Sequence, residues 1–388
     1  MPVFLIATLD TKGSEAEFVR RRLTELGVPV EIVDTSCSGR LGDRGQSVDA
    51  AALDAANLVR EAYAAGRVEG VVAIGGSAGT TIGTAAMRAL PIGIPKVMVS
   101  TLASGDVRHW VGDKDILMLN SIVDFAGINR ISRQVLVNAA AAMAGMVKER
   151  GARSSKRGVE ESQDRPIIAA TMFGVTTPCV QHARKILEDA GYEVLVFHAT
   201  GNGGEAMEAL IREGLIVGVL DITTTELADE FVGGILSAGP DRLRAAGEMG
   251  IAQVVSVGAL DMVNFGPQET VPEKFAGRTF HVHNAFVTLM RTTPEENAEL
   301  GEYIGSRVSV AEGPAAILLP LRGVSAIDGD GQPFDDPVAR QSLFAAIRQN
   351  CGNAELVELD HHINDPAFAE AAANKLLQLL RVNLLRGN

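Results

Sequence analysis

Short apolar runs alternate with amphipathic segments along the whole chain, and this alternation restricts the fold more than any other feature of the sequence. An apolar run at residues 3–7 is followed by a helical pattern at residues 14–26 and by a second apolar run at residues 30–33. Strands that alternate with helices pair in parallel through right-handed crossovers. The pattern therefore predicts an α/β fold built from βαβ units.

The same alternation continues to the end of the chain. In the first half, further strands are predicted at residues 71–74, 96–99 and 116–119, and helices at 48–65, from a glycine-rich turn to 90, and at 131–147. In the second half, strands are predicted at residues 167–170, 194–197, 216–220, 254–257, 316–319 and 356–359, and helices at 178–190, 205–213, 294–307, 337–350 and 367–385. Each half thus has its own set of strands.

The length of 388 residues predicts two domains, because chains beyond roughly 250–300 residues tend to split into separate cores. Residues 148–163 are charged and lack apolar periodicity, which is typical of a linker. We therefore expect two Rossmann-like, doubly wound parallel-sheet domains at residues 1–150 and 166–388, with a linker at 151–165. The similar openings of the two halves, Ala7-Thr8-Leu9-Asp10 and Ala170-Thr171-Met172-Phe173, suggest an old duplication.

The net charge of −13 disfavours nucleic acid and anionic membranes as partners. It still permits an anionic small ligand, because helix N-termini and backbone amides bind anions locally. Cys37, Cys179 and Cys351 lack disulfide or zinc spacing, which favours a reducing compartment. No stretch has the roughly 18 consecutive apolar residues of a membrane span, and the N-terminal run is too short for a signal peptide. We expect a cytoplasmic protein.

Polar residues and glycines follow the predicted strands of the first half. Ligands of open parallel sheets bind beyond the carboxyl ends of the strands, where these residues converge. Hydroxyls, carboxylates and a lysine there suit a phosphorylated ligand with Mg²⁺. The candidate binding residues are Asp10, Thr11, Lys12, Thr35, Ser36, Gly75, Gly76, Ser77, Gly79, Thr80, Thr81, Ser100 and Thr101.

The turn Gly75-Gly76-Ser77-Ala78-Gly79-Thr80 is the strongest single motif. Glycine permits positive φ and close backbone approach, and the following helix directs N–H groups at the turn. The turn lacks the Gly-Lys-Ser/Thr ending of a P-loop and the first glycine of a dinucleotide fingerprint. It therefore predicts a generic phosphate cradle. The alternative is a tight strand–helix turn that needs glycine for its geometry alone.

Polar strand ends also occur in the second half, and they predict either a second ligand site or the other wall of a shared cleft. Arg322 and Ser325 are candidates to clamp an anion, unless they belong to a surface turn. The candidate substrate residues are Phe173, Gly174, Thr176, Thr177, His198, Thr200, Gly201, Asp221, Thr223, His283, Arg322 and Ser325.

Other chemistry-bearing side chains carry weaker signals. His281 and His283 share one face of a predicted strand, and His361-His362 form a second pair, but neither pair has a recognisable third metal ligand. Satisfied polar residues are the simpler interpretation. Cys179 stands in the first turn of a helix, where a thiolate is stabilised, although a small buried residue is the more common role.

The order and spacing of several motifs resemble the Tm-one-like ATP-binding domain family over essentially the whole chain. The motifs are residues 7–13, the glycine turn, Thr171-Met172-Phe173-Gly174, His198-Ala199-Thr200-Gly201 and Leu321-Arg322-Gly323-Val324-Ser325. The resemblance implies two Rossmann-like subdomains, ATP with Mg²⁺ as ligand, and a homodimer. It leaves any catalysed reaction open.

Three functions are compatible with these observations. The first is an ATP-binding protein of small-molecule metabolism, with ATP at the carboxyl edge of the N-terminal sheet and a possible second substrate between the halves. The second is a non-catalytic, ATP-dependent regulatory protein. The third is an enzyme that uses no nucleotide and binds a small phosphorylated or carboxylate metabolite.

Overall fold

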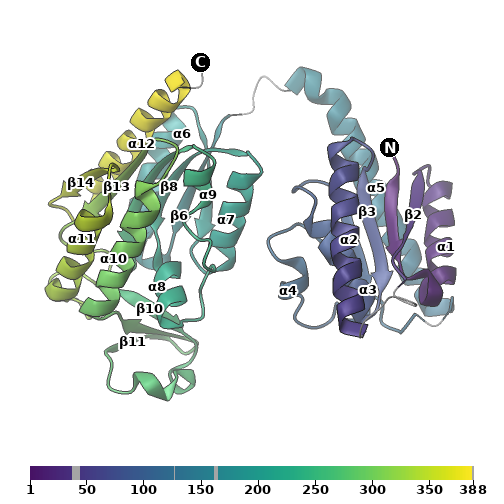
Figure 1. Ribbon diagram of the computed structural model, residues 1–388, viewed down its shortest axis with the longest axis horizontal. Coiled ribbons are helices and arrows are strands. Elements are labelled where there is room, and N and C mark those ends of the chain that lie inside the picture. The colour runs from purple at the N-terminus through teal and green to yellow at the C-terminus, as the bar shows by residue number, and fades with distance from the viewer. Residues whose placement is uncertain (37–43, 126, 161–164, 387–388) are drawn as a thin grey trace. The chain divides into compact units, whose positions relative to one another are not determined.

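The computed structural model describes residues 1–36, 44–125, 127–160 and 165–386, and Cys37 lies outside this part. The chain forms two compact units, Met1–Asp164 and Arg165–Asn388, and each is described by itself (Figure 1). Helix α5 (Arg130–Glu160) continues beyond its predicted end at residue 147 and occupies most of the segment expected to be a linker. The sequence of this part of the helix lacks the apolar periodicity from which a helix is predicted.

Unit 1 is a parallel five-stranded sheet in the order β2-β1-β3-β4-β5. Its strands are β1 (Val3–Ala7), β2 (Val30–Asp34), β3 (Gly70–Gly75), β4 (Lys96–Ser100) and β5 (Leu117–Asn120). Its helices are α1 (Leu9–Glu25), α2 (Arg44–Ala64), α3 (Ser77–Arg88), the short α4 (Arg108–Val111) and α5.

Helices cover both faces of this sheet, which is why its central strands read as continuous apolar runs. Val3 and Leu5 of β1 pack in a core with residues of α1 and α5. Phe4 and Ile6 of the same strand pack in a second core with residues of α2 and α3. The period-two alternation of a strand thus divides β1 between two helical layers.

Unit 2 repeats this plan with a six-stranded parallel sheet in the order β7-β6-β8-β9-β13-β14. The strands are β6 (Ile167–Met172), β7 (Glu193–His198), β8 (Ile216–Thr223), β9 (Ala252–Gly258), β13 (Ala315–Pro320) and β14 (Glu355–Leu359). The first five strands in chain order occupy the same relative positions as β1 to β5 of unit 1. This agreement supports the duplication suggested by the sequence.

The two faces of the second sheet have separate cores. One core joins the sheet to α6 (Thr177–Asp189) and α12 (Pro366–Arg386). The other face is covered by α7 (Asn202–Arg212), α8 (Thr225–Val232), α9 (Ala245–Glu248), α10 (Pro294–Ser309) and α11 (Pro337–Asn350). Both units therefore have the doubly wound α/β architecture that the sequence predicts.

A small antiparallel sheet, β10-β12-β11, is inserted between β9 and α10, and only its strand with His281 and His283 was predicted. Its strands are β10 (Met262–Phe265), β12 (Val287–Arg291) and β11 (Phe280–Asn284). Its strand β10 lies beside α8 at the lower end of unit 2 (Figure 1). The strands have four or five residues each, too few to give a clear periodic signal.

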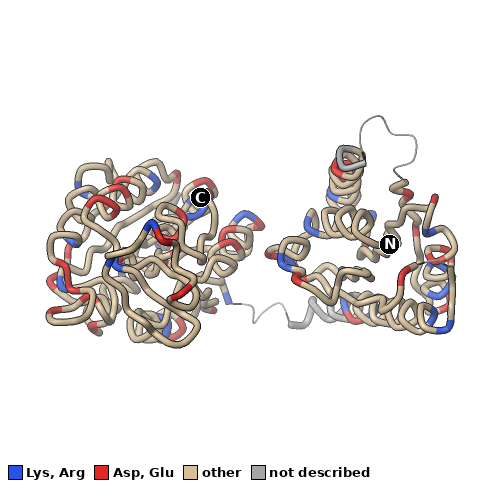
Figure 2. Tube along the Cα trace, turned by 90° about the horizontal axis from the view of Figure 1, so that it is seen from below, with Lys and Arg blue, Asp and Glu red and all other residues tan. Residues whose placement is uncertain are grey.

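Among the residues that the structure describes, no helix combines the length and apolarity needed to cross a membrane. Lys and Arg are interspersed with Asp and Glu over both units (Figure 2).

Glycines at every fourth position allow α3 to lie close to its sheet. A Cβ on Gly75 would lie 2.6 Å from Gly79 Cα, and one on Gly79 would lie 3.1 Å from Ile74 O. A Cβ on Gly83 would lie 2.5 Å from Ala73 Cβ. These three glycines are therefore required by packing.

We expect Gly83→Ala to lower the free energy of unfolding by about 1–3 kcal/mol, because the added methyl group overlaps the sheet. The matched control is Gly145→Ala in α5, where a Cβ meets nothing within 4 Å and the helix gains about 0.5–1 kcal/mol. Urea titration of both variants measures the difference. Changes of the same sign would contradict the close packing of α3.

Candidate functional site

The strand order of unit 1 reverses between the carboxyl ends of β1 and β3. The chain leaves β1 toward β2 and returns to pair β3 on the other side of β1, so this is the point where the strand order reverses. Ligands of open α/β sheets bind at such a point. Thr8 follows β1 here, and the N-terminus of α3 follows β3 through the single residue Gly76.

Gly76 is not explained by packing, unlike its neighbours in the turn. A Cβ at Gly76 would meet only Thr101 Oγ1, at a distance of 3.7 Å. Its φ of −83° is negative, and the expected positive φ is absent from Gly75, Gly76 and Gly79. No side chain caps α3 at this residue. The open space beside Gly76 is therefore available to a ligand.

The predicted hydroxyls of this turn separate into two groups. Thr80 and Ser100 are buried and hydrogen-bond to each other at 2.7 Å, and Thr80 Oγ1 also donates to Gly76 O. Thr81 Oγ1 donates to Ser77 O within the helix. The Ser77 side chain is exposed, and Thr101 is half-buried beside Gly76. Ser77 and Thr101 are thus the hydroxyls of this turn that lie nearest to solvent and to Gly76.

The end of β2 is joined to the start of α1 by a carboxylate. Asp34 Oδ1 accepts from Ser36 Oγ at 2.6 Å, Ser36 N at 3.0 Å and Leu9 N at 3.2 Å. Ser36 Oγ in turn accepts from Asp10 N at 3.1 Å, and Thr35 is buried beside it. The hydrogen bond from the Ser36 hydroxyl holds the pKa of Asp34 below its usual value. The carboxylate stays ionised and orders the edge.

Asp10, Thr11 and Lys12 lie in the first turn of α1, because the helix begins at Leu9 rather than at the predicted residue 14. Asp10 and Thr11 are exposed, and Thr11 Oγ1 is 2.9 Å from Thr8 Oγ1. Lys12 has non-helical dihedral angles, and its Nζ donates to Phe125 O at 2.5 Å. This bond ties α1 to the loop after β5.

The polar strand ends of unit 2 are mostly occupied by one another. Thr171 Oγ1 donates to Asp221 Oδ1 at 2.7 Å, and Thr176 Oγ1 lies 2.8 Å from Thr223 Oγ1. All four residues are buried. Phe173 N donates to Thr176 Oγ1, and Phe173 O accepts from Thr177 Oγ1. This network fastens the ends of β6 and β8 to α6.

The glycine turn after β7, Gly201-Asn202-Gly203-Gly204, already binds a carboxylate of the same chain. The carboxylate of Glu226 accepts from Gly201 N at 2.8 Å and from Gly204 N at 3.0 Å, at the N-terminus of α7. A Cβ on Gly204 would overlap this carboxylate. His198 is exposed beyond the turn, and Thr200 Oγ1 donates to His198 O. The amides of this turn are thus used internally.

Asp221 belongs to a buried ion cluster around Arg242. The fully buried guanidinium donates to both Asp221 oxygens, at 2.6 and 2.7 Å, and to Glu226 at 2.8 Å. Glu208 approaches the same guanidinium at 3.5 Å and accepts from Leu243 N. The three carboxylates raise the pKa of Arg242 well above its ordinary value, against the effect of burial. The cluster connects α7, β8 and α8.

Arg322 and Ser325 lie in different environments and do not form a clamp. Arg322 is exposed and pairs with Asp360, at 2.8 and 2.7 Å. Ser325 is buried and donates to Asp261 Oδ2 at 2.7 Å. Burial and the neighbouring Asp328 charge raise the pKa of Asp261 to about 7. Asp261 Oδ1 has no hydrogen-bond partner among the described residues.

The histidine and cysteine motifs do not assemble metal or nucleophile sites within the described part of the chain. His283 is exposed on β11, while His281 packs against the Phe334 ring. His362 Nε2 lies 2.9 Å from Ser325 O. Burial raises the pKa of the Cys179 thiol to about 12, and the nearby His182 is exposed against Glu370. Cys179 is therefore a small core residue.

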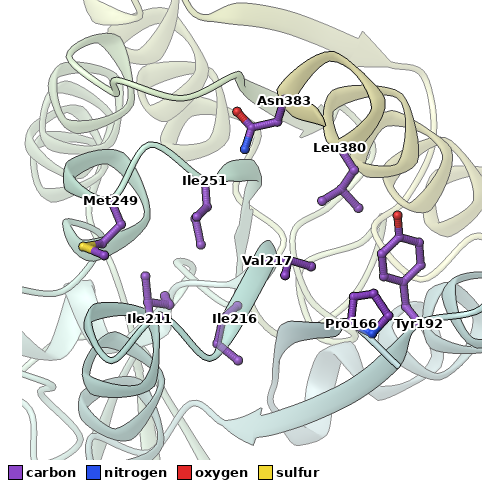
Figure 3. Close-up of a pocket in the computed structure, with 10 residues that line it drawn as sticks. Pro166, Tyr192, Ile211, Ile216, Val217, Met249, Ile251, Leu380 and Asn383 are labelled. Atoms are coloured by element: carbon purple, nitrogen blue, oxygen red, sulfur yellow. The ribbon is translucent and has the colours of Figure 1, made fainter. Parts of the chain in front are cut away.

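An apolar pocket of about 480 Å³ lies at the opposite, amino edge of the second sheet (Figure 3). Its walls are mostly aliphatic, with Tyr192 and Asn383 as polar members. Pro166, Ile211, Ile216, Val217, Met249, Ile251 and Leu380 complete the labelled lining. It shares no residue with the predicted sites.

The charged residues that sequence reasoning missed are Glu208, Glu226, Asp229, Arg242, Asp261, Arg291, Asp328 and Arg340. Each is buried, although charged residues are usually exposed. Their partners come from distant parts of the chain, such as Arg291 with Asp328 and Arg340 with Asp328. Spacing along the sequence gives no signal for such pairs.

We expect Arg242→Met to destabilise unit 2 by about 3–5 kcal/mol, because three carboxylates would remain buried without their counter-charge. The matched control, Arg322→Met, removes an exposed pair and should leave the unfolding midpoint unchanged. Urea unfolding followed by circular dichroism measures both. A wild-type midpoint in Arg242→Met would show that the cluster contributes no stability.

The raised pKa of Asp261 predicts that stability falls as pH rises. Its pKa in the folded state, about 7, exceeds the ordinary aspartate pKa of 3.8, so the folded protein binds the proton more tightly. The associated stability is present at low pH and is lost as pH rises through about 7. Asp261→Asn should make the fall in melting temperature between pH 5 and 8 less steep, and Asp229, whose pKa burial also raises to about 7, should supply part of the slope that remains. The same slope in wild type and variant would contradict the raised pKa.

Two family models match the chain. The N-terminal domain of uncharacterised protein family UPF0261 matches residues 38–152, and its C-terminal domain matches residues 165–380. Among solved structures, MurG of Acinetobacter baumannii aligns with 99% of this chain and over 98% of its own, at 13% identity and a TM-score of 0.24.

Curated relatives extend over nearly the whole chain. A UPF0261 protein of Clostridium tetani is 46% identical over 405 residues, covering 97% of this chain and 98% of that protein. One from Rhizobium meliloti is also 46% identical and covers 95% of this chain and 97% of that protein. The tomato ToMV susceptible protein tm-1(GCR26) is 40% identical over 97% of this chain, which spans 55% of the tomato protein. The tomato Tm-1 proteins are thus among the relatives of this chain. The chain belongs to the UPF0261 family.

Proposed function

We propose that the protein binds ATP together with Mg²⁺ at the carboxyl edge of the first sheet, between Thr8 and the N-terminus of α3. The observation that supports this proposal most is the open space beside Gly76. Gly76 is a glycine with a negative φ that packing does not require, and a side chain there would enter open space beside Thr101. Glycine at such a position permits a ligand to approach the backbone closely.

The start of α3 is suited to bind the phosphates of ATP. The first N–H groups of a helix lack partners within it and attract anions, and no side chain caps this helix. The exposed Ser77 and the half-buried Thr101 add hydroxyl donors. A glycine turn of unit 2 differs in this respect, because Glu226 already fills the turn after β7 at the start of α7.

The donor set of the edge also suits Mg²⁺, which shields phosphate charge when bound. Mg²⁺ usually takes one or two carboxylates together with phosphate oxygens and water. We assign this role to Asp10, whose exposed side chain lies in the first turn of α1. Asp34 is less suited, since its Oδ1 accepts three hydrogen bonds.

The family resemblance supports ATP and a homodimer as parts of the same proposal. A role in cytoplasmic small-molecule metabolism is supported by the free cysteines Cys179 and Cys351 and by the acidic charge. The names of the tomato relatives concern ToMV susceptibility and resistance, and that role is not extended to this chain.

The decisive experiment is a thermal-shift titration of wild type and Gly76→Val with MgATP. ATP at a hundredfold excess over its dissociation constant should stabilise the wild type by about 2.7 kcal/mol. Gly76→Val should stay folded, because a Cβ meets only Thr101 Oγ1, but should lose the response to ATP.

Gly174→Val is the matched control, since it puts the same side chain after β6 of unit 2, where a Cβ meets nothing within 4 Å. It should keep the full ATP response. Loss of the response in Gly174→Val alone would place the ligand in unit 2. Stabilisation by organic acids and not by ATP would favour the nucleotide-independent enzyme.

A further inference from the structure

The loop after β5 contains a strained and exposed apolar residue. Ile122 has a φ of 65°, in the left-handed region that β-branched residues rarely adopt. Val123 N donates to Ser121 O at 2.7 Å, so Ile122 is the central residue of a γ-turn with positive φ, which is a rare and strained turn.

Packing does not account for this conformation. The described residues include two other non-glycine residues with positive φ, Leu243 and Ala259, and both are buried, at 6% and 0% exposure. The Ile122 side chain is 72% exposed. The turn is nevertheless built by specific bonds, since Asn120 Oδ1 accepts from Ile122 N and Ser121 Oγ donates to Val123 O. The fold thus holds an isoleucine toward solvent in a backbone that glycine or asparagine would adopt more easily.

Ile122 stands on the same sheet edge as Gly76. Gly75 pairs with Ser100 and Ser100 with Asn120, so the ends of β3, β4 and β5 form one row. Adjacent strands lie about 4.8 Å apart, which puts Ile122 on the order of 10 Å from Gly76 across the edge. The loop continues to Phe125, whose carbonyl oxygen accepts from Lys12. Lys12, Gly76, Thr101 and Ile122 therefore border one edge.

We propose that Ile122 supplies the apolar contact for the nucleobase of a nucleotide whose phosphates lie at Gly76 and Ser77; this inference rests on the proposed function. A nucleotide needs an apolar surface for the face of its base, at a distance from its phosphate site. The candidate residues beside Gly76 are hydroxyls and backbone amides. Ile122 offers the missing aliphatic surface, and a strained residue in an exposed position fits a role in binding.

The test compares Ile122→Gly and Ile122→Asn with wild type by isothermal titration calorimetry, using MgATP and magnesium tripolyphosphate. Both substitutions relieve the backbone, so the unliganded variants should melt about 2–4 °C higher. ATP affinity should fall about tenfold through loss of the aliphatic contact, while tripolyphosphate affinity stays unchanged. Leu53→Ala, which truncates a different exposed aliphatic side chain of unit 1, should change neither affinity.

The outcomes separate this inference from the proposed function. If the wild type binds neither ATP nor tripolyphosphate, the proposed function fails and Ile122 has no such role. If the wild type binds ATP and the Ile122 variants bind it equally well, the function stands and the base contact is overturned. Equal losses for ATP and tripolyphosphate would also overturn it, because Ile122 would then act by shaping the loop.

Discussion

The burial of both faces of each parallel sheet is the constraint on which the rest of the structure depends. Every residue of β3 and of β9 is buried, and helices take up the side chains on either side. Backbone polar groups of such strands are satisfied within the sheet. Polar side chains can therefore reach a ligand only where the strands end. Most of the hydroxyls and carboxylates among the candidate site residues lie at the carboxyl edges of the sheets.

The two units use this edge differently. In unit 2, Glu226 enters the glycine turn at α7, and Arg242 neutralises it together with Asp221. A buried charge requires such a partner, so the edge becomes a closed, internally satisfied network. In unit 1, Gly76 faces open space and α3 has no side-chain cap. The same local motif, a strand end with glycines before a helix, thus serves cohesion in one unit and suits a ligand in the other.

Much of the fold follows from local patterns. The apolar runs predicted every strand of the two main sheets to within one to three residues at each end, because continuous apolar runs are typical of buried parallel strands. The helical start at Leu9 was missed, since Asp10, Thr11 and Lys12 resemble a polar turn. The last turns of α5 and the short strands β10 and β12 of the antiparallel sheet were missed because they lack periodicity.

The site was predicted less completely than the fold. Gly75, Gly76 and Gly79 are indistinguishable in a sequence, and only their neighbours show that Gly76 alone is unconstrained by packing. Thr171, Asp221 and Ser325 were correctly assigned to the sheet edge, but their buried partners Arg242 and Asp261 lie far along the chain. The strain at Ile122 is a backbone property with no signature in residue order.

The sequence by itself thus determined the alternating α/β architecture, its two halves and the edge at which polar residues gather, because hydrophobic periodicity and strand direction are local properties. Only the tertiary structure decided which polar residues satisfy one another and which face open space. That decision depends on contacts between segments tens of residues apart, where burial makes each unpaired charge costly and close packing leaves room for a ligand at few positions.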